Sequence, residues 1–379
     1  MTAHQPPQVP EPDPAPGNRI EITAEELASP EVDERVRQLH EAAAPALIRA
    51  VGTPQAASPG AWWRGSVAST ALAGLIGGGV GFAFAEVIMG GDGTDRFFVD
   101  DPNMSTAMWV TIFAIGLAAL LTGWEGIESR NGQKVLQAWK TSIPVTAIGG
   151  FVGGIIAQLL YSRFFDRALE RAFAARTESE AFAIMESALR VPRALAFLVA
   201  GAVVGIALGV ASSSKQRAIN GAIGGAIGGF TGGLLFGFIN ASGSVARAVA
   251  LSVTGVAVGA AIGLVEQVRK EVWLEIVNGG MAGKQFILYH DATTIGSAPG
   301  CHVTLIKDPH IAAHHASIVR GPGGAEIHAG DPSAVVLVNG QPVQRAPVAS
   351  GDQVQIGTTL LRLGLREQAM PTVAGMPPA

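Results

Sequence analysis

The chain has 379 residues, of which 48% are hydrophobic and only 15% are charged, and its net charge is −4. Soluble domains carry about 25% charged residues, so this composition excludes a wholly soluble protein, and the acidic balance argues against a nucleic-acid partner. Cys301 is the only cysteine, which excludes an intrachain disulfide and a zinc site built from several cysteines.

The N-terminal part is predicted to form two segments and a linker. Residues 1–18 contain six prolines and almost no bulky apolar side chain, so we expect a disordered tail without a cleaved signal peptide. Residues 19–51 are predicted to form a cytoplasmic helical segment, and residues 52–65 a linker. One apolar face of this segment carries Val32, Val36, Leu39, Ala43 and Leu47. That face needs a partner, which is the membrane surface, the rest of the protein or a second copy.

The deficit of charge lies between residues 66 and 266, which predicts an integral membrane protein with soluble ends. Each apolar run in this region is close to the ~20 residues that a helical span requires. The runs are residues 66–89, 105–124, 142–161, 194–213, 218–239 and 245–265. They predict a bundle of six spans over residues 66–268. The second run has only Gly116 in its middle, which allows it a place on the outside of the bundle.

Glycines recur every four residues in several of these runs, most densely in residues 218–239. In water each interior glycine costs a helix ~1 kcal/mol relative to alanine, but a segment inside a bilayer has to be helical. A stripe without side chains then lets a neighbouring helix approach closely. We therefore predict helix packing at Gly201, Gly205, Gly209, Gly221, Gly225, Gly229, Gly233, Gly237, Gly255, Gly259 and Gly263, with Gly224, Gly228 and Gly232 as a second row.

The charges of the loops predict the orientation. The first loop has one arginine against four aspartates and is expected outside, whereas the lysines and arginines at 130–140 and 215–217 are expected inside. Both termini are then cytoplasmic, as in a multi-pass inner-membrane protein. Residues 162–193 disagree, because they hold six arginines and yet fall outside. Their apolar residues suit amphipathic helices lying in the interface, so the side of this loop stays open.

From Trp273 onward the pattern changes to short alternating strands with turn residues between them, which predicts a β-sandwich. The order of motifs over residues 271–366 resembles a forkhead-associated (FHA) domain. The motifs are Thr294-Ile295-Gly296, Cys301 to Leu305, Asp308-Pro309 through His315-Ala316, Val338-Asn339-Gly340 and Gly351-Asp352. The predicted fold class is therefore multi-domain, with a helical membrane bundle, a C-terminal all-β FHA-like sandwich and a disordered tail at 367–379.

The resemblance implies a phosphothreonine reader, but the residues that would hold the phosphate are changed. The arginine expected after Gly296 is Ser297, and Ala312 stands in place of a serine. A phosphate with about −2 charge needs charged donors, and residues 296–302 and 308–316 contain no lysine or arginine. We therefore expect phosphothreonine binding to be weak or absent at neutral pH. The loops would instead bind an unphosphorylated protein.

The candidate binding residues on these loops are Gly296, Ser297, His302, Ala312, His314, His315, Asn339 and Gly340. The resemblance implies that His315 braces the loops and that Asn339 contacts the backbone of the bound peptide. Two readings of His302, His310 and His314 remain open: a metal or phosphate site that charges near pH 6, or exposed loop histidines. Glu86 is either an ion site within the first span or a solvated residue at its end.

The sequence contains no nucleophile–base pair, paired carboxylates or metal-ligand spacing above background, so it predicts no enzyme, cofactor or metal. The leading hypothesis is an inner-membrane adaptor that displays its FHA-like module to a cytoplasmic protein partner, with the lipid bilayer and a second copy as further contacts. The alternative is a channel or transporter formed by the glycine-striped bundle and regulated by the FHA-like domain. Scarce polar residues inside the spans favour the adaptor.

Overall fold

The computed structural model describes residues 65–89, 102–238, 243–305, 308–321, 324–330 and 334–366. The predictions for the N-terminal tail, helical segment and most of the linker, for the first loop and for the C-terminal tail lie outside these residues. The surroundings of Gly237 also lie outside the described part.

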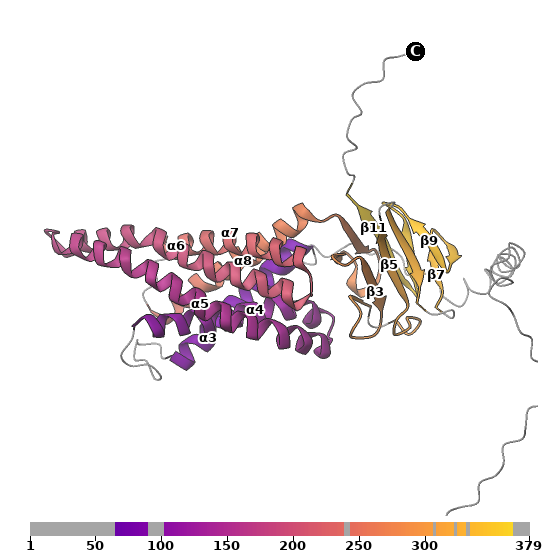
Figure 1. The fold of residues 1–379 in the computed structure, drawn as a ribbon, viewed down its shortest axis with the longest axis horizontal. Helices are drawn as coiled ribbons and strands as arrows, with labels where there is room; N and C mark the ends of the chain where they lie inside the picture. Colours follow the sequence, from indigo (N-terminus) through magenta and orange to yellow (C-terminus); the bar gives the residue numbers. More distant parts are fainter. Residues whose placement is uncertain are drawn as a thin grey trace, which may run out of the picture. The chain divides into compact units, whose positions relative to one another are not determined.

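Six helices in the described part are long and apolar enough to cross a membrane, with mean hydropathies between 1.3 and 2.5. They are α3 Ser66–Met89, α4 Pro102–Glu128, α5 Gly132–Phe173, α6 Glu178–Ala211, α7 Lys215–Phe238 and α8 Ser244–Arg269 (Figure 1). This is the number of apolar helices that the sequence predicts, and the protein is a membrane protein with a C-terminal β-sandwich.

The six helices pack as a closed ring around an apolar centre. Each helix packs against the next one in the chain, α8 returns to α3, and α4 also contacts α6 across the ring. The centre is filled by buried aromatic and aliphatic side chains, among them Phe113, Leu117, Leu251 and Ile262. Because an ion pathway requires a polar lining, this centre does not favour conduction.

Several pairs of neighbouring helices meet backbone against backbone at glycines. A methyl group added to Gly201 on α6 would overlap the carbonyl oxygen of Gly225 on α7. One added to Gly228, on the second row of α7, would overlap the carbonyl oxygen of Ala257 on α8. The stripe on α8 faces α3, where Gly255 would meet the backbone of Gly74. Helix α7 therefore uses both of its glycine rows, one for each neighbour.

Helix α4 does not have the outer place that its single central glycine allowed. Phe113 and Leu117 on α4 are each only 2% exposed, and Gly116 lies against the backbone of Gly81 on α3. The apolar window of α5 is instead the least buried of the six, at 28%. One glycine is enough for the close contact with α3, and large side chains on the rest of α4 fill the centre of the ring.

Residues 162–193 form no separate interfacial helices, which corrects the sequence-based expectation. Helices α5 and α6 run on through this region as one antiparallel hairpin, and only residues 174–177 are not helical. Thr177 caps α6 by accepting a hydrogen bond from the backbone N–H of Glu180 (3.2 Å). Ala168 and Leu189 are buried here, so the helical repeat of apolar residues continues past the spans. By connectivity, the turn lies at the end of the bundle opposite the sandwich (Figure 1).

The C-terminal part is a sandwich of two sheets. Their strand orders are β2-β1-β11-β10-β7-β8 and β4-β3-β5-β6-β9, and every pair is antiparallel except β3 with β4. The strands are β1 Val272–Ile276, β2 Gln285–Ile287, β3 Ala292–Gly296, β4 Val303–Thr304, β5 Ala316–Gly321, β6 Gly324–Ala329, β7 Val336–Val338, β8 Gln341–Val343, β9 Arg345–Val348, β10 Gln353–Ile356 and β11 Thr359–Leu365.

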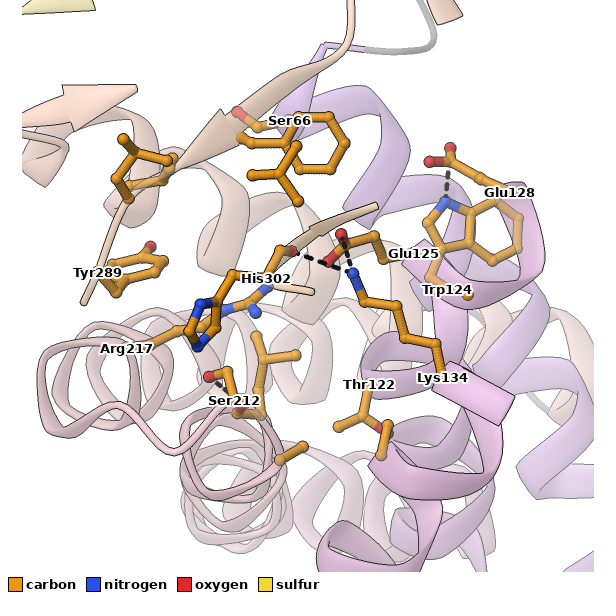
Figure 2. A pocket seen from close by; sticks show the side chains of 18 of the residues that line it. Ser66, Thr122, Trp124, Glu125, Glu128, Lys134, Ser212, Arg217, Tyr289 and His302 are labelled. Carbon is orange, nitrogen blue, oxygen red and sulfur yellow. Dashed lines mark hydrogen bonds and ion pairs between the residues drawn. The ribbon is translucent and has the colours of Figure 1, made fainter. Parts of the chain in front are cut away.

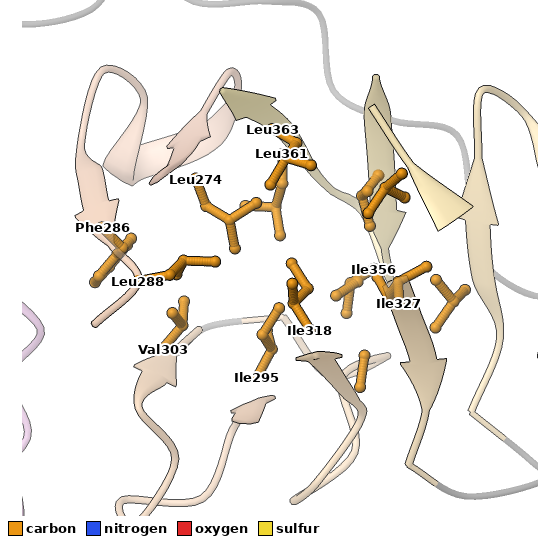
Figure 3. Packing of buried hydrophobic residues seen from close by; sticks show 14 of the residues in the cluster. Leu274, Phe286, Leu288, Ile295, Val303, Ile318, Ile327, Ile356, Leu361 and Leu363 are labelled. Carbon is orange, nitrogen blue, oxygen red and sulfur yellow. The ribbon is translucent and has the colours of Figure 1, made fainter. Parts of the chain in front are cut away.

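Alternating residues of the strands fill the space between the sheets. On β1 the burial alternates strictly, and Leu274 belongs to the same apolar core as Ile318, Ile327 and Leu361 (Figure 3). The edge strands β8 and β9 carry Pro342 and Pro347, which cannot donate a backbone hydrogen bond to an added strand. Addition of a further strand at these two edges is therefore disfavoured.

The sandwich is joined to the bundle by a very short connection. Helix α8 ends at Arg269 and β1 begins at Val272, so only two residues link them. Two extended residues reach about 7 Å. The ammonium group of Lys270, in this link, lies 4.1 Å from the ring centroid of Trp273 on β1. The sandwich is therefore kept close to the end of α8.

Candidate binding face and the cavity beside the bundle

The first two loops of the sandwich are joined along their backbones. The N–H groups of Ser297 and Ala298 donate to the carbonyl oxygens of Ala312 and Ala313, each at 3.0 Å. The hydroxyl of Ser297 donates to the carbonyl of Ile311, also at 3.0 Å. The backbone N–H groups of Ser297 and Ala298 and the hydroxyl of Ser297 are therefore already used within the sandwich.

His315 joins the second loop to the segment that precedes β7. Its ring is 3% exposed, and Nδ1 accepts a hydrogen bond from the N–H of Ala312 (3.1 Å). The carbonyl of Val335 lies 3.0 Å from Nε2, so Nε2 carries the proton and donates. These contacts fit the bracing role that the FHA resemblance implies for this histidine.

Asn339 holds a tight turn together. It adopts a φ of 51°, and Gly340 follows at 82°, a left-handed pair in which asparagine and glycine are favoured. Its Nδ2 donates to Asp352 (2.8 Å), and its Oδ1 accepts from the N–H of Gln353 (2.9 Å). Among the described residues, these are the hydrogen bonds of its side-chain amide, and they leave its second N–H without a described partner. The sequence analysis did not identify Asp352 as the partner, although the Gly351-Asp352 motif was the available signal.

The three histidines His302, His310 and His314 do not converge. The ring of His302 stacks on His290, with 4.2 Å between ring centroids, while His310 lies 3.1 Å from Asp308 and His314 lies 3.4 Å from the sulfur of Cys301. Within the described residues, no group of three or more His, Cys, Asp or Glu side chains is placed to hold a metal ion.

The surroundings of His302 also argue against its role in a site that becomes protonated near pH 6. Burial lowers the pKa of His302, and the neighbouring His290 and Lys134 lower it further. The ring therefore stays neutral at the pH at which free histidine becomes charged. Burial has the opposite effect on the nearby thiol and raises the pKa of Cys301.

Asp308 anchors the second loop to the last hairpin. Its Oδ2 accepts hydrogen bonds from the N–H and the hydroxyl of Thr358 at 2.6 and 2.8 Å, and its Oδ1 accepts from the N–H of His310 at 3.0 Å. The side chain is 6% exposed. Burial by itself would raise the pKa of Asp308, but the hydrogen bonds from Thr358 and His310 lower it below the usual value of 3.8.

Asp308→Asn is therefore expected to destabilise the sandwich at neutral pH by about 2 kcal/mol, the range of one hydrogen bond to a charged group. Because the folded pKa of Asp308 is lowered, the ionised group stabilises the protein above pH ~3.8, and this contribution is lost as the pH falls through the folded pKa. Thermal unfolding of the full chain in detergent at several pH values measures it. If Asp308→Asn lowers the free energy of unfolding by the same amount at about pH 7 and about pH 3, this account is contradicted.

The loop face that remains is exposed and carries little charge. His310, Ala313, His314, Asn339 and Gly340 are exposed. Three loops form this face: residues 296–302, residues 308–316 and the turn at residues 339–340. Their described residues include no lysine or arginine, and Lys307 lies outside the described part. The face therefore offers imidazoles, backbone groups and small side chains, which suits a neutral protein surface better than a phosphate.

A cavity of about 330 Å³ lies between the sandwich and the end of the bundle (Figure 2). The first loop faces it through residues 299–303. Three ion pairs line the cavity: Lys134 with Glu125 at 2.7 Å, Arg217 with Glu266 at 3.0 Å and Lys284 with Glu128 at 2.8 Å. The sequence analysis missed this site, although several of these charges lie just at the ends of apolar runs.

Glu86 lies at the other end of the bundle and is paired. Its carboxylate accepts hydrogen bonds from the guanidinium of Arg247 (2.6 Å) and from the hydroxyl of Ser244 (3.0 Å) on α8. A carboxylate paired with arginine at the end of a span fits the solvated reading better than an ion site.

Comparison with known proteins assigns the sandwich but not the whole chain. Residues 275–367 match the family model described as the inner membrane component of the type III secretion system, cytoplasmic domain. The sandwich is an FHA-like domain. The prediction made from its motifs is thereby confirmed for about a quarter of the chain. No curated protein matches this chain.

Solved structures of FHA domains match the same region. The FHA domain of the CT664 protein from Chlamydia trachomatis is 24% identical, over 25% of this chain and 97% of that chain, with a TM-score of 0.24. The second FHA domain of the ABC transporter Rv1747 from Mycobacterium tuberculosis is 32% identical, over 21% of this chain and 79% of that chain, with a TM-score of 0.19. Each match covers about a quarter of this chain or less.

Proposed function

We propose that this protein is an inner-membrane adaptor whose cytoplasmic FHA-like sandwich holds a protein partner at the membrane surface, independently of threonine phosphorylation. One observation carries the proposal. The donors of Ser297 and Ala298 are spent on the backbone of the second loop, and the described loop residues present no lysine or arginine. A dianionic phosphate would find no charged fork at this face. An unphosphorylated protein surface can bind without such a charged fork.

The attachment of the sandwich supports a role at the membrane. The two-residue link after Arg269 keeps the loop face near the bilayer, so a bound partner is brought there too. The matched family is described as an inner membrane component with a cytoplasmic domain. We extend the inner-membrane location and the cytoplasmic sandwich to this chain. The lysines and arginines at residues 130–140 and 215–217, in the loops between membrane helices, agree with this orientation. The hairpin formed by α5 and α6 then projects outside.

The alternative of a channel or transporter regulated by the sandwich has less support. The described helices enclose an apolar cluster that includes Phe82, Phe113 and Val258. We therefore assign the close glycine contacts to rigid packing of a membrane anchor.

Membrane vesicles of both orientations test the adaptor and its topology together. Inside-out vesicles that contain the full chain are expected to capture a cytosolic protein, and right-side-out vesicles are not. Capture should be the same from phosphatase-treated cytosol. A reporter at residue 175, in the turn between α5 and α6, should read external.

A matched pair of variants localises the capture. Ala313→Arg places a bulky charge on the exposed loop face and should abolish capture, whereas Ala292→Arg makes the same change at the exposed far end of β3 and should not. Capture that requires phosphorylated cytosol, or that both variants retain, would refute the proposal. So would a cytoplasmic reporter signal at residue 175.

A further inference from the structure

The sandwich is held against the bundle by cationic contacts. The ammonium of Lys284, before β2, lies 2.8 Å from the carboxylate of Glu128 at the end of α4, and these side chains are 11% and 22% exposed. The same carboxylate accepts hydrogen bonds from Trp124 and from the hydroxyl of Ser69, each at 3.0 Å. Glu128 is thus oriented by the bundle to receive a cation from the sandwich.

Two further cations of the bundle reach the sandwich. Lys134 is held by Glu125 and donates to the carbonyl of His302 at 3.2 Å, which is a contact with the first loop itself (Figure 2). The guanidinium of Arg217 is held by Glu266 and lies 5.7 Å from the ring centroid of Tyr289. We call these three contacts, Lys284–Glu128, Lys134–His302 and Arg217–Tyr289, the clamp.

The buried apolar clusters of the two parts are separate in the described chain. The apolar cluster of the sandwich contains only residues from Val272 onward, and the apolar cluster of the bundle ends at Ile262. The cavity lies between them and is lined by residues of both parts, among them Tyr289 of the sandwich and Arg217 of the bundle. Interfaces that are polar and incompletely packed allow domains to move relative to each other.

The clamp is therefore strong enough to order the contact but weak enough to open. Removing two charges from water offsets much of the attraction between them, so a partly buried ion pair adds little net free energy. The two-residue link after Arg269 remains when the clamp opens. Opening would then tilt the sandwich without releasing it from the membrane.

We propose that the clamp opens reversibly, and that the side of residues 299–303 that lines the cavity in the closed state becomes available to the protein partner only when it is open. The inference rests on the proposed function, since opening regulates binding only if the sandwich has a partner. It assigns an autoinhibitory contact to Lys284, Glu128 and Lys134.

The reactivity of Lys134 measures opening without any partner. Its side chain is 19% exposed in the closed state, whereas Lys140 on the same helix is exposed and serves as an internal reference. Full-length protein in lipid nanodiscs is treated with an amine-acylating reagent. Mass spectrometry then gives the ratio of the acylation rate of Lys134 to that of Lys140. Lys284→Glu and Glu128→Lys, made separately, should each raise the ratio by about tenfold, because each leaves a charge unpaired. The double variant should restore it.

Salt and a matched control complete the test. Raising the ionic strength from about 0.05 to about 0.5 M should raise the ratio for the unmodified protein, because salt screens the clamp. This titration needs no variant and decides the case if a charge-reversed chain does not fold. Arg362→Glu reverses a charge on the exposed side of β11 and should leave the ratio unchanged.

Two results would overturn the inference. One is a ratio that responds to neither charge reversal nor salt. The other is a rise in both single variants that persists in the double variant, because the rise would then not depend on the pairing of Lys284 with Glu128. Capture by vesicles is measured separately. A clamp that does not open would therefore refute this inference but not the adaptor proposal. Failed capture with a clamp that opens would refute only the adaptor.

Discussion

Replacing Gly229 and Gly233 on α7 by leucine together is expected to prevent assembly of the bundle. A methyl group at Gly229 would already overlap the carbonyl oxygen of Phe197, and one at Gly233 would lie 2.7 Å from the Cα of Ala194. These neighbours are backbone atoms of α6 and cannot move aside as a flexible side chain does. Overpacking costs about 1–3 kcal/mol at each site, and here both sites push the same two helices apart.

The helix itself should survive, because leucine has a higher helix propensity than glycine. The expected result is therefore a helical but loosely packed protein, seen as aggregation or early elution in size-exclusion chromatography and as a large fall in melting temperature in detergent. Thr231→Leu provides the control, because Thr231 is exposed on the same helix between the two glycines. A double variant as stable as the control would mean that this stripe does not pack against α6.

The full-length protein in nanodiscs is expected to bind phosphothreonine peptides and their unphosphorylated counterparts with affinities within about threefold of each other. A hydrogen bond to a charged group contributes roughly 1.5–3 kcal/mol. Loss of two such bonds removes a preference on the order of 10²-fold. The arginine and serine expected for a phosphate reader are Ser297 and Ala312 here, and the hydroxyl of Ser297 is turned to Ile311.

Histidine protonation should restore little of this preference. His302, on the first loop of the sandwich, stays neutral beside Lys134 and His290, so it adds no positive charge for a phosphate as the pH falls from about 7.5 to about 6. The measurement is a titration with a degenerate peptide library in both forms, with a phosphothreonine-binding FHA domain as positive control. Micromolar binding at about pH 7.5 that disappears on dephosphorylation would show that the phosphate is held in another way.

Local patterns in the sequence determined the fold class. Apolar runs near the length of a span predicted six helices, because a bilayer admits no other structure for such segments. Period-two alternation after Trp273 predicted the sandwich, and the FHA motifs assigned its type. The altered residues Ser297 and Ala312 could also be identified without coordinates, since a missing arginine needs no three-dimensional context.

Contacts between distant segments were decided only by the tertiary structure. The arginine-rich residues 162–193 were expected to lie in the interface, but packing of Ala168 and Leu189 keeps them in one helical hairpin. The pairing of Lys284 with Glu128 joins residues 156 positions apart. No periodic pattern encodes such a pair. Which loop faces the bundle follows from how the two folded parts meet, whereas the sequence specifies only what each part is made of.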